Sequence, residues 1–298
     1  MGNETTEMCA EKAAITAAID YNRAEPCVVR ETAHWAVVYK TPHLPTAPLR
    51  ADERNTLVYW FLHRTEVGRR SREARVHGKK EIEAGLLHRL DTDTRGLVLF
   101  AKDQAVYDFL SARQEAGQMI KTYCAFVEQC RPDAAVNRMA VQEGIAAKLP
   151  LALESQFRNF GPGAKRVAPV FPGSRHYKKD GRLYTTVIEA VDMLPFSIGG
   201  NDTVPQTACE SRPSPPVIRV RCRLSRGYRH QVRAHLAAAG LPIVGDLLYA
   251  PQGAEAAHEA ENTGVSLQLY AVSLAFPDPE NPQRSILVAL PPPDKMNP

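Results

Sequence analysis

Runs of apolar residues at two different spacings divide the chain into expected strands and helices. Alternating or continuous apolar runs bounded by turn residues predict strands over 34–40, 97–101, 121–128, 183–190 and 217–224. Apolar residues at helical spacing predict helices over 11–19, 103–115 and 230–239, and a further short apolar stretch spans 56–62. Because strands outnumber helices and do not alternate regularly with them, the pattern predicts an α+β protein with a mixed, mostly antiparallel sheet.

Two segments between these elements, 158–181 and 195–216, are rich in proline and glycine. Strand patterns resume directly after each segment, so we expect surface excursions rather than domain linkers. The last residues, PPPDKMNP, are expected to be poorly ordered. We therefore expect one catalytic domain over residues 34–290, preceded by an N-terminal extension of residues 1–33 and followed by a disordered tail of residues 291–298.

Positive charge is concentrated in two parts of the chain, although the formal net charge of +4 over 298 residues is modest. Residues 64–80 hold seven Lys/Arg against Glu66 and Glu73, and residues 219–233 hold six Arg and no acid. A basic run suits a surface that binds phosphates, but for residues 64–80 a solvated face explains the charge equally well. The charge therefore permits a nucleic-acid partner without requiring one.

Nothing in the sequence resembles a signal peptide, a membrane span or a disulfide framework. The first residues, MGNETTEMCAEK, are acidic and polar, and no apolar run approaches the roughly 20 residues that cross a bilayer. The six cysteines are scattered and form no close CxxC pair. We therefore expect a soluble, cytoplasmic protein with reduced thiols.

Arginines occupy every second position in part of the expected strand 217–224. Arg219, Arg221 and Arg223 alternate with apolar residues, so one face of this strand would contact the core while the other carries three guanidinium groups. A row of like charges is unfavourable unless anions neutralise it. Phosphates of a nucleic acid would do so, and so would acidic side chains from elsewhere in the fold. The sequence leaves both explanations open.

The histidines of the expected helix 230–239 do not predict a metal site. His230 and His235 are five residues apart, about 140° around a helix, so they do not converge on one ion as an i, i+4 pair would. Arg233 is three residues from His230 and therefore lies on roughly the same side of the helix. We expect no metal here.

Two carboxylates, Asp91 and Asp93, lie in a polar turn that cations flank on both sides. His88 and Arg89 precede them, and Arg95 follows. Asp in a turn is usually structural, because its side chain accepts hydrogen bonds from neighbouring backbone N–H groups. A carboxylate among cations is also a candidate nucleophile, because nearby positive charge lowers its pKa by roughly 1–3 units. The spacing is compatible with both roles.

Three long segments, in order along the chain, resemble the motifs of RluA-type RNA pseudouridine synthases. They are HRLDTDTRGLVLFAK (88–102), KTYCAFV (121–127) and GYRHQVRAHLAAAGLPIVGDLLYA (227–250), and AVVYKTPHLPTAP (36–48) resembles the start of that catalytic domain. The resemblance spans about residues 34 to 276. It implies the fold of that family, a mixed, mostly antiparallel bent sheet flanked by helices, with a central active-site cleft.

The resemblance also implies roles for the matching residues. Asp91 matches the catalytic aspartate, Tyr123 the tyrosine that stacks on the target uracil, and Arg233 the basic residue paired with the aspartate. Arg89 matches an arginine that, in some relatives, fills the gap left by the flipped base. The implied reaction isomerises uridine to pseudouridine in rRNA or tRNA, is redox-neutral and needs no cofactor.

The chain departs from the family pattern at three places in these motifs. Arg95 stands where the family usually has Ser, Tyr228-Arg229 replaces Arg-Thr, and Lys40-Thr41 replaces Lys-Pro. Arg95 would be a large cation close to the nucleophile, able to hold a phosphate or to disturb the turn. We also expect no N-terminal S4-like RNA-binding domain, because only about 33 residues precede the first matched strand and they lack its basic character.

The basic residues near Asp91, on the expected strand and in the basic run are the candidate RNA contacts. They are Arg89, Arg95, Arg229, His230, Arg219, Arg221, Arg223, Arg69, Arg70 and Arg72. We expect a monomer with RNA as its partner and no membrane contact. A catalytically silent RNA-binding relative is the first alternative. The second is an unrelated hydrolase that uses Asp91 and a histidine, although no second acid or convergent metal set accompanies them.

Overall fold

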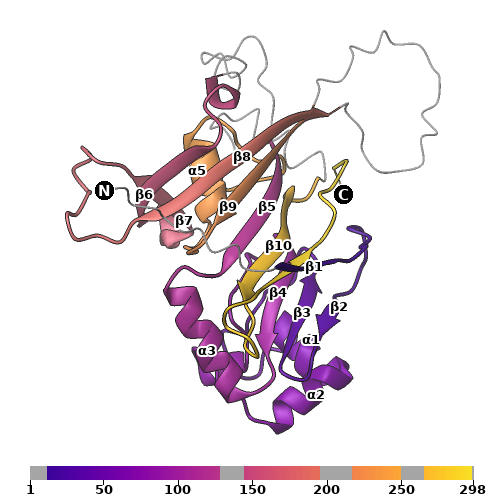
Figure 1. Cartoon of the computed structure of the whole chain (residues 1–298). Helices are drawn as coiled ribbons and strands as arrows, with labels where there is room; N and C mark the ends of the chain where they lie inside the picture. Colours follow the sequence, from indigo (N-terminus) through magenta and orange to yellow (C-terminus); the bar gives the residue numbers. More distant parts are fainter. Residues whose placement is uncertain (1–11, 128–143, 195–216, 250–264, 297–298) are drawn as a thin grey trace, which may run out of the picture.

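The computed structural model describes residues 12–127, 144–194, 217–249 and 265–296, whose strands join into one large sheet (Figure 1). The strands follow the order β2 (Cys27–Glu31), β3 (Trp35–Lys40), β4 (Arg95–Ala101), β10 (Leu269–Pro277), β5 (Ile120–Val127), β9 (Val217–Leu224), β8 (Tyr184–Leu194), β6 (Leu151–Phe160) and β7 (Arg166–Val170). β1 (Lys12–Thr16) and β11 (Ser285–Ala289) pair with each other, and β11 also pairs with β10. The described helices are α1 (Leu57–Arg64), α2 (Glu66–Glu73), α3 (Gln104–Glu115) and α5 (Gln231–Ala238), with 3-10 turns at Glu81–Glu83 and Pro162–Ala164.

Most neighbouring strands are antiparallel, which confirms the predicted mixed sheet. Among the described residues, the parallel pairs are β4 with β10 and β1 with β11. At the β4–β10 junction Gly96 has a φ of 132°, and a Cβ there would lie 2.3 Å from the carbonyl oxygen of Ala271. Glycine is therefore required where the strand enters the sheet directly after the polar turn with Asp91.

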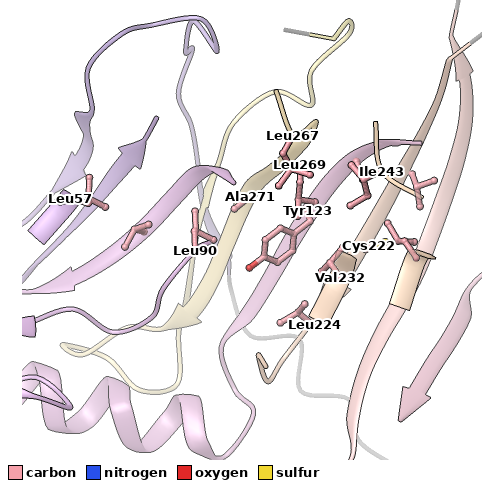
Figure 2. Packing of buried hydrophobic residues seen from close by; sticks show 14 of the residues in the cluster. Leu57, Leu90, Tyr123, Cys222, Leu224, Val232, Ile243, Leu267, Leu269 and Ala271 are labelled. Carbon is pink, nitrogen blue, oxygen red and sulfur yellow. The ribbon is translucent and has the colours of Figure 1, made fainter. Parts of the chain in front are cut away.

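Apolar side chains cover both faces of the sheet, and β5 shows how alternate residues divide between them. Tyr123 and Ala125 belong to the cluster on one face, here called face 1, whereas Cys124 and Phe126 belong to the cluster on the opposite face, face 2. Figure 2 shows part of the face 1 cluster, in which Tyr123 lies among Leu90, Leu224, Val232 and Ala271. The parity of a residue in its strand therefore decides which of the two clusters its side chain joins.

The helices pack on both faces and begin at capping residues. α1 places Phe61 against Phe100 on face 1, with ring centroids 4.2 Å apart, and α3 contributes Leu110 to face 2. Asp103 caps α3 as predicted, since its Oδ1 accepts a hydrogen bond from the backbone N–H of Val106 at 2.9 Å. The five predicted strands and the helices over 103–115 and 230–239 are confirmed as β3, β4, β5, β8, β9, α3 and α5, with ends shifted by a few residues.

The N-terminal part differs from the expectation. The helix predicted over 11–19 is wrong, because Lys12–Thr16 form β1, and pairing with β11 outweighs the local helix preference of the alanines. The apolar stretch 56–62 lies largely within α1. β1 and β2 both lie within the expected extension of residues 1–33, so the sheet continues across the boundary expected at residue 34.

The C-terminal tail also differs. The carbonyl oxygen of Pro293 accepts a hydrogen bond from Arg219 at 2.9 Å, and Met296 is buried in the face 2 cluster. These contacts fix residues 291–296, for which disorder was predicted, while 297–298 and the excursion 195–216 lie outside the described residues. None of the described helices has the length and apolar character needed to cross a membrane.

Candidate active site

A cavity of about 660 Å³ opens on face 1, where three segments far apart in the chain meet. Its walls are the loop 86–94, the beginning of β5 and the turn 227–233 that enters α5. These segments belong to the three motifs that carry the resemblance. The structure therefore brings Asp91, Tyr123 and Arg233 together in one cavity.

Asp91 is held between a guanidinium and an imidazole. Nη1 of Arg233 donates a hydrogen bond to its Oδ2 at 3.2 Å, and Nε2 of His230 lies 3.9 Å from its Oδ1. About a quarter of the side chain stays exposed (23%), so the carboxylate is fixed on one side and open to the cavity on the other. A carboxylate placed in this way is available to a bound ligand.

Asp246 orients the guanidinium of Arg233. The two carboxylate oxygens of Asp246 accept hydrogen bonds from Nε and Nη2, both at 2.7 Å, which leaves Nη1 for Asp91. Burial lowers the pKa of Arg233, but the hydrogen bonds and charges of Asp246 and Asp91 more than offset this, so its pKa is raised. Sequence reasoning assigned no role to Asp246, although it lies in the GDLLYA part of a quoted motif.

Tyr123 forms one wall of the cavity. It is 8% exposed, and Figure 2 shows its ring projecting from β5 within the face 1 cluster. Burial, together with the nearby negative charge of Asp91, raises the pKa of its phenol, so the hydroxyl is protonated at neutral pH. A flat, buried ring beside a carboxylate suits a heterocyclic base that stacks on it.

Two buried polar side chains, which sequence reasoning missed, hold the loop that carries Asp91. Nζ of Lys40 donates to three backbone carbonyl oxygens, one of them that of Thr92 at 2.7 Å. Oγ1 of Thr46 donates to the carbonyl oxygen of Leu90 at 2.7 Å and accepts from its N–H at 3.1 Å. The segment containing Lys40 and Thr46 thus fixes the backbone on both sides of Asp91.

His230 and Arg229 join the cavity to the hairpin formed by β6 and β7. Nδ1 of His230 lies 3.2 Å from the hydroxyl of Tyr249, which also bonds to the backbone of Val167 in β7. Burial lowers the pKa of His230, an effect that Asp91 opposes. Nη2 of Arg229 donates to three oxygens of the hairpin, namely Oδ1 of Asn159 and the carbonyl oxygens of Ala164 and Arg166.

The β6–β7 hairpin and the loop after it form a basic and aromatic surface that sequence reasoning did not identify. Residues 158–182 hold seven Lys/Arg and a single acid, Asp180. Phe160 and Phe171 are each 42% exposed, and the guanidinium carbons of Arg158 and Arg166 lie 5.2 and 5.3 Å from the ring centroid of Phe160. The signal was the interleaving of cations and aromatic residues, which the glycines and prolines of the same segment obscured.

Arg89, the candidate for filling the gap of a flipped base, also lines the cavity. Its side chain is about half exposed, and Nη1 lies 3.6 Å from Oε1 of the buried Glu83. The guanidinium therefore has one anionic neighbour and a solvent-facing side from which it can reach a ligand.

Arg95 does not line the cavity, and its predicted contact with RNA is contradicted by its burial. It is 0% exposed and donates hydrogen bonds to the carbonyl oxygen of Tyr21 and to Oγ of Ser266, while its guanidinium carbon lies 5.3 Å from the ring centroid of Tyr270. The physical reason is strand alternation, because Arg95 has the same parity in β4 as Leu97, which belongs to face 2.

The three arginines of β9 lie on face 2, away from the cavity, and acids of β8 accompany them. Nη2 of Arg219 lies 2.9 Å from Asp192, whereas Arg221 and Arg223 lie 3.7 and 2.7 Å from Glu189. Ile218, Val220, Cys222 and Leu224 of β9 lie on face 1, as the alternation predicted. Of the two explanations for this row, phosphates of a nucleic acid or acidic side chains of the fold, the arrangement corresponds to the second. The structure does not bring the row to Asp91.

Arg69, Arg70 and Arg72, in the basic run 64–80, also do not line the cavity. Arg69 and Arg70 form ion pairs with Glu66 within α2, Arg69 also pairs with Glu73, and Nη1 of Arg72 lies 2.9 Å from Nδ1 of His63. These contacts leave the side chains exposed on the helix surface. Their predicted contact with RNA stays a prediction.

His235 is sealed in the core rather than placed in the cavity. Its Nε2 lies 2.8 Å from Oγ of Ser155 and its Nδ1 lies 2.9 Å from Oγ1 of Thr186, and all three residues are almost fully buried. Burial lowers the pKa of His235 to about 4. A serine–histidine pair without access to the cavity gives no support to a hydrolase.

Comparison with known proteins shows the family of this chain. The model of the RNA pseudouridylate synthase family matches residues 34–238, more than half of the chain. The chain belongs to this family. The matched residues include Asp91, Tyr123 and Arg233 but end before Asp246.

Similar members of the pseudouridylate synthase family come from distant organisms. A human pseudouridylate synthase is 27% identical over 227 residues, covering 76% of this chain and 31% of the relative. An uncharacterized RNA pseudouridine synthase of Bacillus subtilis is 26% identical over 76% of this chain and 62% of the relative. A ribosomal large subunit pseudouridine synthase D of Zymomonas mobilis is 26% identical over 85% of this chain and 65% of the relative. The chain thus spans about a third to two thirds of the length of these relatives.

Solved structures show the same synthase fold. The structure of human RNA pseudouridylate synthase domain containing 1 superimposes with a TM-score of 0.57 at 18% identity, covering 92% of this chain and 85% of that one. A second human structure, domain containing 4, gives a TM-score of 0.50 at 17% identity over 89% of this chain and 88% of that one. At these identities the likeness establishes the fold, which is the one that the sequence motifs implied.

Proposed function

We propose that this protein is an RluA-type RNA pseudouridine synthase that isomerises particular uridines of rRNA or tRNA, with Asp91 as its catalytic carboxylate. The observation that carries the proposal is the meeting of Asp91, Arg233 and Tyr123 in one cavity. Family membership supports the type of reaction, and the geometry supports the assignment of residues.

The target uridine must leave its stack before a carboxylate can reach its ribose, which costs a few kcal/mol. Stacking of the uracil on Tyr123 offsets part of that cost, by about 1–3 kcal/mol for a stacked base. The cavity of about 660 Å³ is large enough for a flipped nucleotide. With the base on Tyr123, the sugar carbon C1′ lies toward Asp91.

Asp91 then promotes cleavage of the glycosidic bond between C1′ and N1, and the bonding electrons leave with the uracil. Arg233 orients the carboxylate through the hydrogen bond from Nη1, because Asp246 holds the guanidinium in place. The freed uracil turns within the site and bonds to C1′ through C5. C5 finally loses its proton and N1 gains one, so atoms and charge balance without an oxidant or reductant.

The basic and aromatic surface of the β6–β7 hairpin supports an RNA partner. Arg229 lines the cavity and is bonded to that hairpin, so a strand entering the cavity would pass the hairpin. Exposed Phe160 offers a ring on which a base can stack, and the surrounding Lys and Arg can neutralise phosphates. We place the nucleotides that flank the target uridine on this surface.

A catalytically silent RNA-binding relative is the competing proposal. It shares the RNA surface but not the reaction, so the carboxylate of Asp91 distinguishes the two. Asp91→Asn keeps the size of the side chain and removes its charge. It should abolish isomerisation and leave RNA affinity largely intact.

Pseudouridine mapping across total RNA tests the proposal in cells. Cells lacking the protein would be compared with the same cells carrying the wild type or Asp91→Asn. A site lost on deletion and regained with the wild type alone would support the reaction and identify the RNA. If no site changes while the protein is expressed, the silent-binder proposal takes its place.

A further inference from the structure

Lys121 is a buried cation of the cavity that the reaction above does not use. It lies two residues before Tyr123 on β5, so both side chains are on the same face, with Cα atoms about 7 Å apart. Lys121 is 5% exposed and lines the cavity together with its strand partner Leu224. Its ammonium lies near the turn into α5, since a Cβ at Gly227 would be 3.9 Å from Nζ.

The ammonium of Lys121 has no carboxylate and no hydrogen-bond partner in the part of the chain that the structure describes. Burial lowers the pKa of Lys121 to about 8. The other buried cation at the site, Arg233, has two carboxylates. A buried charge without an anion is unfavourable, so the geometry indicates that a negative charge arrives with the ligand or develops on it.

The charge state of His88, a neighbour of Lys121, bears on which side chain carries the positive charge. It also lines the cavity, and its Nε2 accepts the N–H of Leu99 at 3.3 Å, so the imidazole proton of the neutral form is on Nδ1. Burial and the positive charge of Lys121 lower the pKa of His88, which keeps it uncharged. Of these two neighbouring side chains, Lys121 therefore carries the charge.

We propose that Lys121 stabilises the negative charge that develops on the uracil when the glycosidic bond breaks. The C1′–N1 bond breaks with its electron pair going to N1, and the charge spreads over the ring and its carbonyl oxygens. Lys121 keeps its own proton and donates a hydrogen bond to one of these oxygens while the base lies on Tyr123. The charge is neutralised when an electron pair of C5 forms the new bond to C1′.

Asp91 and Lys121 thereby act on opposite parts of the nucleoside. The carboxylate faces the sugar, which becomes electron-poor, and the ammonium faces the base, which becomes electron-rich. Fixed charges directed at the place where charge develops are usually the largest single contribution to catalysis. This role deepens the proposed function and rests on it.

The test compares two substrates that differ in how much stabilisation the negative charge on the departing uracil requires. Both are one short RNA hairpin with the site found by mapping, carrying either uridine or 5-fluorouridine at the target. Fluorine withdraws electrons and stabilises the uracil anion, so its departure depends less on Lys121. Because C5 of 5-fluorouridine carries no hydrogen to lose, breakage of the C1′–N1 bond is measured for both substrates rather than formation of pseudouridine. The variants are Lys121→Met, Lys121→Arg and, as a matched control, Lys102→Met. Lys102 is another buried lysine, bonded to the carbonyl oxygen of Thr32 outside the cavity.

Lys121→Met is expected to slow single-turnover cleavage of the C1′–N1 bond of uridine by about 100-fold, the usual loss when one such donor is removed. RNA affinity should stay within about twofold, and the loss should be about tenfold smaller with 5-fluorouridine. Lys121→Arg should restore part of the rate, and Lys102→Met should break the C1′–N1 bond of both substrates at the wild-type rate.

Equal losses on the two substrates would overturn the proposal. So would weaker RNA binding with a normal rate at saturation, which would make Lys121 a phosphate contact. If circular dichroism shows that Lys121→Met is unfolded, the comparison of substrates is made with the Lys121→Arg variant. A wild-type protein that breaks the C1′–N1 bond of neither substrate would contradict the proposed function itself.

Discussion

Replacing Asp246 with asparagine is expected to lower the free energy of unfolding by about 3–5 kcal/mol, the usual cost of breaking a buried ion pair. The carboxylate is fully buried, receives two hydrogen bonds from Arg233 at 2.7 Å, and also accepts the backbone N–H groups of Leu248 and Tyr249. An amide turns one oxygen into an NH₂ group that faces the guanidinium. It also removes one of the two negative charges that neutralise Arg233.

Urea unfolding followed by circular dichroism measures this loss. Asp93→Asn is the matched control, because Asp93 belongs to the same cavity but pairs, at 3.0 Å, with the exposed His43. The control should cost less than about 1 kcal/mol. A loss below about 1 kcal/mol for Asp246→Asn, with an unchanged denaturant slope, would refute the view that this pair holds Arg233 in place.

Four further changes test other parts of the structure. Lys40→Met removes the hydrogen bonds from Nζ that hold the loop of Asp91, so kcat should fall about 100-fold with little change in KM. An equal rise in KM would contradict the role of Lys40 in positioning Asp91. The pKa of His235 is about 4 in the folded protein and near 6.5 in the unfolded chain, so between these values the unfolded chain binds more protons. The free energy of unfolding therefore decreases by about 3 kcal/mol as the pH falls from about 6.5 to 4. His235→Gln should show a weaker pH dependence of the urea midpoint; an unchanged dependence would assign it to other groups. Phe160→Ala should weaken RNA binding by about 1–3 kcal/mol without changing the rate at saturation. Reversing Arg69, Arg70 and Arg72 to glutamate tests whether α2 also contacts RNA, since an unchanged salt dependence of binding would remove α2 from the interface.

Much of the fold could be predicted because strand and helix periodicity is local. The alternation of arginine and apolar residues in 217–224 predicted both the strand and the direction of its two faces. Asp103 predicted the start of α3 because Asp is a common helix N-cap, and its capping hydrogen bond is present. The three motifs identified Asp91, Tyr123 and Arg233, and their meeting in one cavity follows from the fold that the motifs imply.

The features that were missed depend on contacts between distant segments. β1 forms because β11 is available more than 250 residues later, which no local pattern reveals. Asp246 gains its role only when the chain folds back on Arg233. Acids of β8 neutralise the arginines of β9, so a charged row that suggested phosphates proved to be paired within the sheet.

Arg95 shows a different kind of error, one that the sequence itself could have corrected. It was assigned to the polar turn with Asp91, but β4 begins at Arg95. Extending the alternation of Leu97 and Leu99 back by two residues places Arg95 on face 2, inside the core. The boundary of one strand therefore decided whether this cation was expected to reach RNA.

The most direct test of the central claim is tritium release from RNA labelled at C5 of uracil, because C5 loses its hydrogen when it becomes the attachment point to ribose. The substrate is total RNA from cells lacking the protein, incubated with purified wild type or Asp91→Asn. We predict release by the wild type and none by Asp91→Asn, which should bind the RNA with similar affinity. Comparable release by both proteins would contradict the catalytic role of Asp91, and no release by either would contradict the enzyme itself.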